Sequence, residues 1–288
     1  MSVQRPLEAR TCVVTGATSG IGRETALELA RLGAHAVVVG RSARRCRDVT
    51  GAIGKLGGAP AVSVVADLAS LREVRALAAD LLGQLQRIDV LVNNAAVVPR
   101  RRETSADGHE MQLAVNHLAP FLLTRLLLDR LRASAPARIV NVASQVHYQG
   151  EIHWDDIGLV RGYQPATAYN QSKLANVMFT LALARRLEGT GVTANCVHPG
   201  VIGTRLLNDL FGESPLLLFR TRSAHAPPIV GARSIAFVAA SPDLEGVSGR
   251  YFKETQEQEP SADARNLEQQ ERLWALSERL VGLAATPD

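Results

Sequence analysis

Cysteines are scarce in this sequence, and aromatic residues make up only 4% of it. Cys12, Cys46 and Cys196 lie far apart and form no CxxC or Cys/His spacing, which argues against a disulfide framework and a zinc site. The histidines also lack ligand spacing with cysteines or carboxylates, so we expect no metal. The low aromatic content favours helices packed on buried strands over an aromatic-rich sandwich. These absences leave a reducing compartment as the default.

The sequence also has no strong excess of one charge and no long apolar run. Its 32 Lys and Arg residues are interleaved with 28 Asp and Glu residues, which predicts a solvated surface and no nucleic-acid partner. The apolar stretch "LAPFLLTRLLLDRL" is interrupted by Arg125, Asp129 and Arg130, so we do not expect it to span a membrane. The opening "MSVQRPLEAR" contains no apolar signal region. We therefore expect a cytoplasmic protein without an integral membrane segment.

Short β-branched runs alternate with helical patterns along the chain. Seven runs are predicted to be strands: "TCVVTG", "AHAVVVG", "AVSVVAD", "IDVLVNNAA", "ARIVNVAS", "VTANCVHPG" and "GRYF". Runs such as "VVVG" lack polar alternation, which is typical of strands covered on both faces. No linker-like tract or internal repeat interrupts the pattern. The sequence therefore predicts one α/β domain over 1–288, a doubly wound Rossmann fold with a seven-stranded, mostly parallel sheet and helices on both faces.

Two predicted helices, 110–132 and 166–186, are apolar on more than one face. A helix that lies only on a sheet needs a single apolar stripe. The excess leaves two explanations open. Either a partner subunit covers the second face, as in a homodimer or homotetramer, or neighbouring helices of the same chain cover it.

The first predicted strand ends in "TGATSGIG", which places three glycines at the start of the next helix. Glycines allow a sharp turn and a close approach of the backbone to a pyrophosphate, and a helix N-terminus offers free N–H groups to it. The turn therefore predicts a dinucleotide site. We assign to this site Gly16, Thr18, Ser19, Gly20, Ile21 and Gly22.

The second predicted strand ends in Gly40 and Arg41, at the position where an acidic residue would bind the ribose of NAD. A guanidinium binds a phosphate through two hydrogen bonds and stacks on adenine. Arg41 therefore predicts NADP(H) in preference to NAD(H). For Arg44 and Arg45 two interpretations stay open: they contribute to the phosphate site, or they are the polar start of a helix.

Two further strand ends complete the predicted adenosine site. The third predicted strand ends in Asp67 and Leu68, and a carboxylate there can accept a hydrogen bond from the adenine amino group. The fourth ends in "NNAA", where Asn94, Ala95 and Ala96 leave room for the adenosine ribose. We therefore include all five residues in the predicted cofactor site.

The stretch "TAYNQSKLAN" places Tyr169 and Lys173 on one face of a predicted helix. Taken alone, such a pair usually lies on the solvated face of a helix. A carbonyl that receives a hydride also needs a proton near neutral pH, however, and a phenol has a pKa of about 10. A neighbouring ammonium lowers that pKa, and Ser144, at the end of the fifth predicted strand, is placed to donate to the carbonyl oxygen. Together with the nucleotide motifs, the pair predicts an acid–base centre.

Several motifs occur together in the order and spacing of one protein family. "TGATSGIG", "NNAA", Asn116, Ser144, "YNQSK" and "HPG" resemble those of the short-chain dehydrogenases/reductases, and the likeness covers nearly the whole chain. "GIGRETALELA", "VNHLAPFLLT" and "VHPGVIGT" are similar to the retinol-dehydrogenase-like branch, which also resembles the protochlorophyllide-reductase-like enzymes. The resemblance implies a single NAD(P)-binding oxidoreductase domain with a catalytic tetrad of Asn116, Ser144, Tyr169 and Lys173.

The resemblance also implies roles at the nicotinamide end of the site. Lys173 would bind the nicotinamide ribose, and Asn116 would kink its helix around a water that links Lys173 to solvent. After the sixth predicted strand, "HPG" and the residues that follow it would wall the nicotinamide ring. We assign to this end of the cofactor site Tyr169, Lys173, Pro199, Gly200, Ile202 and Thr204.

In the family that the chain resembles, the segment about 201–228 is a variable substrate lid, and its apolar composition here favours a lipophilic substrate. The predicted pocket residues are Gln145, His147, Leu206 and Leu210. We expect an NADP(H)-dependent oxidoreductase, similar to carbonyl reductases, that acts on a lipophilic aldehyde, ketone or secondary alcohol of retinal-like, steroid-like or polyketide-like structure. Two alternatives stay open: a reductase of a conjugated C=C bond, and a non-catalytic NADP(H)-sensing module.

Overall fold

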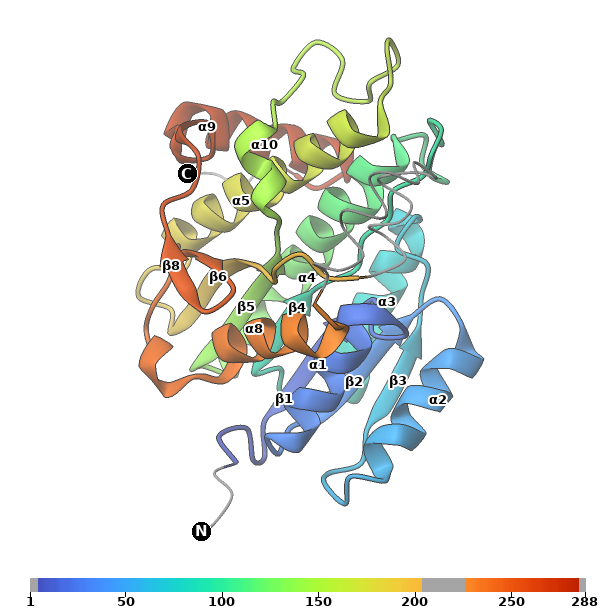
Figure 1. The fold of residues 1–288 in the computed structure, drawn as a ribbon, viewed down its shortest axis with the longest axis vertical. Coiled ribbons are helices and arrows are strands. Elements are labelled where there is room, and N and C mark those ends of the chain that lie inside the picture. The colour runs from blue at the N-terminus through green and yellow to red at the C-terminus, as the bar shows by residue number, and fades with distance from the viewer. Residues whose placement is uncertain (1–4, 204–225, 285–288) are drawn as a thin grey trace.

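In the computed structural model, which describes residues 5–203 and 226–284, one sheet forms the centre of the protein (Figure 1). Its strands are β1 (Thr11–Thr15), β2 (His35–Gly40), β3 (Val62–Val65), β4 (Val90–Asn93), β5 (Ala137–Val142), β6 (Val192–His198), β7 (Tyr251–Lys253) and β8 (Gln256–Gln258). They are ordered β3-β2-β1-β4-β5-β6-β7-β8. Every neighbouring pair is parallel apart from β7 and β8, which are antiparallel.

The predicted doubly wound α/β sheet is confirmed, but the count of seven strands is wrong, because the described residues form eight. The additional strand, β8, has the sequence QEQ, and all of its residues are exposed. It carries no apolar signal because it covers no core. It forms because the chain turns back after Lys253, at Glu254 with a φ of 58°, and pairs along the edge of β7.

Helices cover both faces of the sheet (Figure 1). The α-helices are α1 (Gly20–Arg31), α2 (Ala43–Gly54), α3 (Leu71–Gln84), α4 (Ala119–Ala133), α5 (Pro165–Arg186), α8 (Pro228–Ala240), α9 (Ala262–Arg265) and α10 (Leu267–Leu280). A π-helical turn, η1 (Leu113–Leu118), precedes α4, and two 3₁₀ turns are η2 (Gln145–Gln149) and η3 (Pro242–Leu244). One core lies between the sheet and α1, α2 and α8, and another lies between the sheet and α3, α4 and α5.

None of the described helices has the length and apolarity that a membrane crossing requires.

The helices that follow residue 186 were not predicted from the sequence. α8 is apolar on most of its sides, so it lacks the single stripe that marks a helix on a sheet. α10 did carry a signal, because the Asn266 side chain caps it by accepting the backbone N–H of Gln269. A capping residue before an amphipathic stretch could therefore have identified α10, whereas only the packing of α8 identifies it as a helix on the sheet.

Helix α10 covers the second apolar face of α4 and α5. The Trp274 ring lies 5.1 Å from the Phe121 ring and 5.9 Å from the Phe179 ring, measured between centroids. The guanidinium groups of Arg186 and Arg125 lie 4.1 and 5.2 Å from the centre of the same indole ring. Of the two explanations for the excess of apolar residues, coverage within the same chain therefore accounts for this surface. A homodimer or homotetramer through these helices stays a prediction.

Candidate active site

The carboxyl ends of the parallel strands meet in a cavity of about 1140 Å³. The glycine turn after β1 forms one end, and residues that follow β5 together with α5 form the other. Ligands of open α/β sheets bind at this edge. The predicted cofactor residues on the wall are Gly16, Thr18, Ser19, Gly20, Ile21, Gly22, Arg41, Asp67, Leu68, Asn94, Ala95, Ala96, Tyr169, Lys173, Pro199, Gly200 and Ile202. Thr204 lies outside the described residues.

The glycine turn leaves no room for side chains. Gly16 and Gly20 have φ angles of 65° and 53°, which other residues rarely adopt. A Cβ on Gly22 would lie 2.3 Å from Nδ2 of Asn94 and 2.4 Å from the Gly16 carbonyl oxygen. Ser19 precedes α1 without a side-chain capping bond, so the first N–H groups of the helix are available at the cavity wall. The turn therefore fits a pyrophosphate.

Arginines line the cavity beyond the glycine turn. Arg41 follows β2, Arg44 and Arg45 lie in the first turn of α2, and all three are exposed. Arg44 and Arg45 therefore start a helix and also reach the cavity, so both interpretations of them agree with the structure. A Cβ on Gly40 would lie 2.4 Å from Cγ2 of Thr18. An acidic side chain at position 40, which would favour NAD, has no space here unless Thr18 moves.

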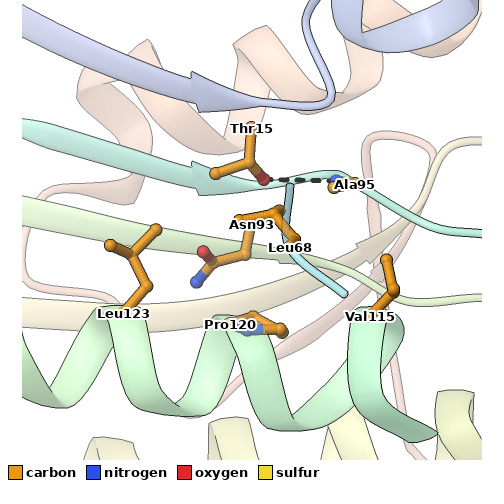
Figure 2. Close-up of a pocket in the computed structure, with 7 residues that line it drawn as sticks. All are labelled: Thr15, Leu68, Asn93, Ala95, Val115, Pro120 and Leu123. Atoms are coloured by element: carbon orange, nitrogen blue, oxygen red, sulfur yellow. Dashed lines mark hydrogen bonds between the residues drawn. The ribbon is translucent and has the colours of Figure 1, made fainter. Parts of the chain in front are cut away.

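Thr15, which was not predicted as a site residue, holds the chain at the end of β4, beside the glycine turn. Its hydroxyl accepts the backbone N–H groups of Asn94 at 3.0 Å and Ala95 at 3.2 Å, and Figure 2 shows the bond to Ala95. The Asn94 side chain donates to the Thr15 carbonyl oxygen at 2.8 Å. After the end of β3, Oδ1 of Asp67 accepts the Ala69 N–H at 3.0 Å, which fixes that carboxylate. The predicted adenosine end is therefore built on fixed backbone.

A small, mostly apolar space lies beneath this strand end (Figure 2). It is lined by Thr15, Leu68, Asn93, Ala95, Val115, Pro120 and Leu123, and it is too small to admit a water molecule. Nδ2 of Asn93 donates to the Thr124 hydroxyl at 3.0 Å and to Oδ1 of Asn141 at 2.8 Å. These bonds tie β4 to α4 and β5. The space is therefore part of the packing under the cavity and not a second ligand site.

Tyr169 and Lys173 lie on α5 and are 7% and 2% exposed, which excludes a solvated helix face. Nζ of Lys173 lies 5.5 Å from the centroid of the Tyr169 ring and donates to the Val142 carbonyl oxygen at 2.8 Å. Ser144 follows β5, and its side chain hydrogen-bonds with that of Tyr169. The Ser144 hydroxyl also accepts the Val146 N–H at 3.4 Å. The structure thus brings Ser144, Tyr169 and Lys173 together on the wall of one cavity.

Burial controls the pKa values of this pair. It raises the pKa of Tyr169, and the hydrogen bond with Ser144 opposes that rise. Burial also lowers the pKa of Lys173 to about 8. The Tyr–Lys spacing predicted that the lysine lowers the tyrosine pKa, but the net shift of that pKa is upward. The reason is that burial removes water from the phenolate, and this is the larger effect.

Asn116 is the tetrad residue that does not reach the cavity wall. It lies in the π-helical turn η1 and is 1% exposed. Its Oδ1 accepts the Val97 N–H at 2.8 Å, and its Nδ2 donates to the Val97 carbonyl oxygen at 3.2 Å and to the Ser172 hydroxyl at 3.1 Å. π-helical turns are frequent at functional sites. Asn116 therefore joins the segment after β4 to the residue before Lys173, a positioning role.

At the other end of the cavity, the turn η2 supplies the wall. Gln145 lines the cavity as predicted, and Val146, Tyr148 and Gln149 line it as well. A 3₁₀ turn repeats every three residues, so residues 145 and 148 share one side, and 146 and 149 share another. The sequence did not reveal the turn type, which is why Val146 and Gln149 were missed.

His147, which was predicted to line the substrate pocket, lies on the third side of η2 and is 0% exposed. Both of its ring nitrogens contact backbone groups, those of Ser144 and Ser261. The structure therefore does not bring it to the cavity wall. Leu206 and Leu210, and most of the predicted lid about 201–228, lie outside the described residues.

A parallel sheet that carries a glycine turn on a large cavity is typical of nucleotide-binding proteins, and the buried Tyr–Lys pair on the same cavity is a candidate acid–base centre. The family model for short chain dehydrogenase matches residues 10–214. The chain therefore belongs to the short-chain dehydrogenase family, a family of oxidoreductases that use nicotinamide cofactors.

The similar proteins cover nearly the whole chain. Human retinol dehydrogenase 14 is 41% identical over an alignment of 300 positions, which covers 96% of this chain and 88% of that protein. The crystal structure of a protein of uncharacterised function from Mycobacterium paratuberculosis has a TM-score of 0.79 and 34% identity, over 97% of this chain and 96% of that one. Pseudomonas aeruginosa RhlG, solved as an active-site complex with NADP, has a TM-score of 0.71 and 27% identity, over 87% and 97%. Within the family, the chain falls in the retinol-dehydrogenase-like branch.

Proposed function

We propose that this protein transfers a hydride between NADP(H) and a lipophilic aldehyde, ketone or secondary alcohol. The observation that carries the proposal is the cavity, which has the glycine turn and Arg41 at one end and Ser144, Tyr169 and Lys173 at the other. The similarity to human retinol dehydrogenase 14, whose name specifies retinol, supports a lipophilic substrate. Family membership by itself does not decide which carbonyl or alcohol is used.

The side chains at the catalytic end have distinct roles in this proposal. A nicotinamide cofactor bound in the cavity would supply or accept the hydride. Ser144 would donate a hydrogen bond to the substrate oxygen and orient it. The Tyr169 hydroxyl would give that oxygen a proton during reduction and take one during oxidation.

Lys173 is the cation that this chemistry requires. A phenolate on Tyr169 is costly at such a buried position, because burial raises the pKa of this tyrosine. With a pKa lowered to about 8, Lys173 stays mostly protonated at neutral pH. Its ammonium lies 5.5 Å from the tyrosine ring centroid, so it would offset part of the cost of the phenolate. Asn116 would hold the lysine in place through Ser172.

Two features support NADP(H) over NAD(H). Arg41 and the neighbouring Arg44 and Arg45 place positive charge at the end of β2, where the adenosine ribose of a bound dinucleotide lies in this fold. A carboxylate side chain at position 40, which would bind the unphosphorylated ribose, would require Thr18 to move. A 2′-phosphate would therefore meet guanidinium groups and no opposing acid at position 40.

The decisive experiment mixes the purified protein with NADPH or NADH and a panel of carbonyl compounds, with nicotinamide absorbance as the readout. The panel contains retinal, medium-chain aldehydes, aromatic ketones, steroids and quinones, with a conjugated enone whose products are analysed. We expect NADPH oxidation with at least one lipophilic carbonyl, much weaker oxidation of NADH, and loss of both in Tyr169→Phe.

Each alternative has its own outcome in this experiment. Saturation of the C=C bond of the enone, with its carbonyl intact, would favour the conjugated-bond reductase. Tight NADPH binding without turnover of any compound would favour the sensing module. Equal rates with NADH and NADPH would contradict the assignment of Arg41.

A further inference from the structure

A buried histidine lies between the catalytic end of the cavity and the C-terminal part of the chain. Nδ1 of His147 lies 2.8 Å from the Ser144 carbonyl oxygen, and Nε2 lies 3.3 Å from the backbone nitrogen of Ser261. A backbone N–H can only donate, so Nε2 has to accept, and the proton of a neutral imidazole is then on Nδ1. Nδ1 therefore donates to Ser144. Burial lowers the pKa of His147, which favours this neutral form.

The turn that contains His147 needs support from outside. η2 is a 3₁₀ turn of 5 residues, and the hydrogen-bond geometry of such turns is poorer than that of an α-helix. The Tyr148 hydroxyl donates to the Glu259 carbonyl oxygen, so two successive side chains of the turn are held by the segment 259–261. On the opposite side, a Cβ on Gly150 would lie 2.6 Å from the carbonyl oxygen of Asn170, the residue after Tyr169. The turn is thus held between the C-terminal segment and α5.

The His147 ring makes packing contacts as well as hydrogen bonds, and a substitution can keep the first while it removes the second. Its centroid lies 4.1 Å from that of Tyr148 and 4.6 Å from that of Tyr251. A phenyl ring would preserve these contacts and lose both hydrogen bonds. The role of the two nitrogens can therefore be tested without emptying the space that the ring fills.

We infer that His147 is a positioning residue for Ser144. Its Nδ1–H fixes the carbonyl group of the serine, and its Nε2 ties that group to the segment 259–261, so the C-terminal part of the chain sets the direction in which the Ser144 hydroxyl meets a substrate oxygen. The effect on catalysis rests on the proposed function, whereas the hydrogen-bonded link between the two segments does not.

Three substitutions distinguish the two hydrogen bonds. His147→Phe removes both, His147→Asn keeps an amide donor near the position of Nδ1, and His147→Gln places its amide near the position of Nε2. Because small misplacements of a catalytic group cost up to about a hundredfold, we expect kcat to fall about tenfold to a hundredfold in His147→Phe and less than about threefold in His147→Asn. His147→Gln should resemble His147→Phe more than His147→Asn. The Kd for NADPH should stay unchanged in all three.

A double-mutant cycle shows whether the histidine acts through the serine. In a Ser144→Ala background, His147→Phe should lower kcat no further, because the group that it positions is gone. A further fall of the same size in that background would overturn the inference, and so would equal kcat values for His147→Asn and His147→Gln. His35→Phe, the same substitution at the start of β2 and away from the cavity wall, is the matched control and should leave kcat unchanged.

Amide hydrogen exchange tests the link without catalysis. His147→Phe should accelerate exchange in both 144–150 and 259–265, and His147→Asn should accelerate it mainly in 259–265. Unchanged exchange in both segments of His147→Phe would overturn the inference whatever the activity. If the wild-type protein reduced no carbonyl while His147→Phe still accelerated exchange in both segments, the proposed function would fail and the link would stand.

Discussion

The two ends of the cavity are built from different parts of the chain. The cofactor end consists of backbone and of exposed side chains: glycines with positive φ, the N–H groups that start α1, and arginines that face solvent. At the catalytic end, the Tyr169 and Lys173 side chains of α5 are buried, and Val142 of β5 holds Lys173. One end therefore depends on local chain geometry, and the other depends on packing.

This difference decides which physical effect dominates at each end. Charges at the exposed end interact through water and are screened by salt, so a single arginine contributes a moderate amount to affinity. At the buried end, loss of hydration shifts the pKa of Tyr169 upward and that of Lys173 downward. We therefore expect substitutions at the catalytic end to have the larger effects, and to act on turnover or stability rather than on nucleotide affinity.

Tyr169→Phe should produce the largest effect. It removes the proposed proton donor, so kcat should fall by about a thousandfold, within the usual range for loss of an acid–base group. The Kd for NADPH, measured by fluorescence titration, should change little, because the glycine turn and Arg41 are untouched. Tyr163→Phe, a tyrosine that does not line the cavity, is the matched control. Comparable loss of turnover in both variants would contradict the assignment of Tyr169.

Lys173→Met should stabilise the protein at neutral pH while abolishing turnover. A pKa lowered from 10.5 to about 8 corresponds to about 3 kcal/mol of destabilisation at 1.36 kcal/mol per unit. Below pH 8 the lysine is charged in both the folded and the unfolded chain, so the folded state bears this full cost. As the pH rises from 8 towards 10.5, the folded state releases the proton first, and the wild-type protein gains stability.

Urea unfolding of both proteins at pH 7 and pH 10 checks this prediction. The free energy of unfolding of Lys173→Met should exceed that of the wild-type protein by about 2 to 3 kcal/mol at pH 7, and the difference should shrink at pH 10. A difference of equal size at both pH values would show that the lysine is not desolvated as the structure indicates.

Arg41→Ala should act on nucleotide choice alone. Loss of hydrogen bonds to a charged group costs about 1.5 to 3 kcal/mol, so KM for NADPH should rise about tenfold to a hundredfold. KM for NADH and the kcat values should remain close to those of the wild-type protein. Arg72→Ala, an exposed arginine of α3 that does not line the cavity, is the control. An equal rise of KM for both nucleotides would indicate that Arg41 does not bind the 2′-phosphate.

Ala96→Gly should have the smallest effect. Ala96 lines the cavity at the predicted adenosine ribose, and removing one methyl group from a contact surface changes affinity by less than about 1 kcal/mol. We expect the Kd for NADPH to change by less than about fivefold, with kcat unaltered. A large change in either quantity would mean that the segment after β4 adopts another backbone when its alanine is lost.

Much of the cofactor end was predictable from the sequence because its geometry is local. Gly16, Gly20 and Gly22 identify a turn that only glycine adopts or tolerates, and Arg41 is identified by its place directly after a strand. Thr15 was missed although it lies one residue before that turn. A threonine at a strand end has no distinctive pattern, and its importance comes from the backbone of β4, which is 79 residues away in the chain.

At the catalytic end, the sequence identified the residues but not their environment. Ser144, Tyr169 and Lys173 lie on one cavity as their spacing predicted, but the direction of the tyrosine pKa shift depended on burial. His147 shows the same limit. A pocket residue and a buried residue look alike in a short loop until the turn type is known.

The amino-acid sequence by itself determined the alternation of strands and helices, the glycine turn, and the residues of the proposed acid–base pair. These features are set by hydrophobic periodicity and by conformational limits that act over a few residues. Only the tertiary structure decided that α10 covers α4 and α5, that β8 extends the sheet, and that residues 259–261 support the turn after Ser144. The contacts of α10 and of residues 259–261 join segments that are far apart in the sequence and meet only in the folded chain, and β8 forms because the folded β7 offers it an edge. The buried electrostatics depend on the same folded contacts.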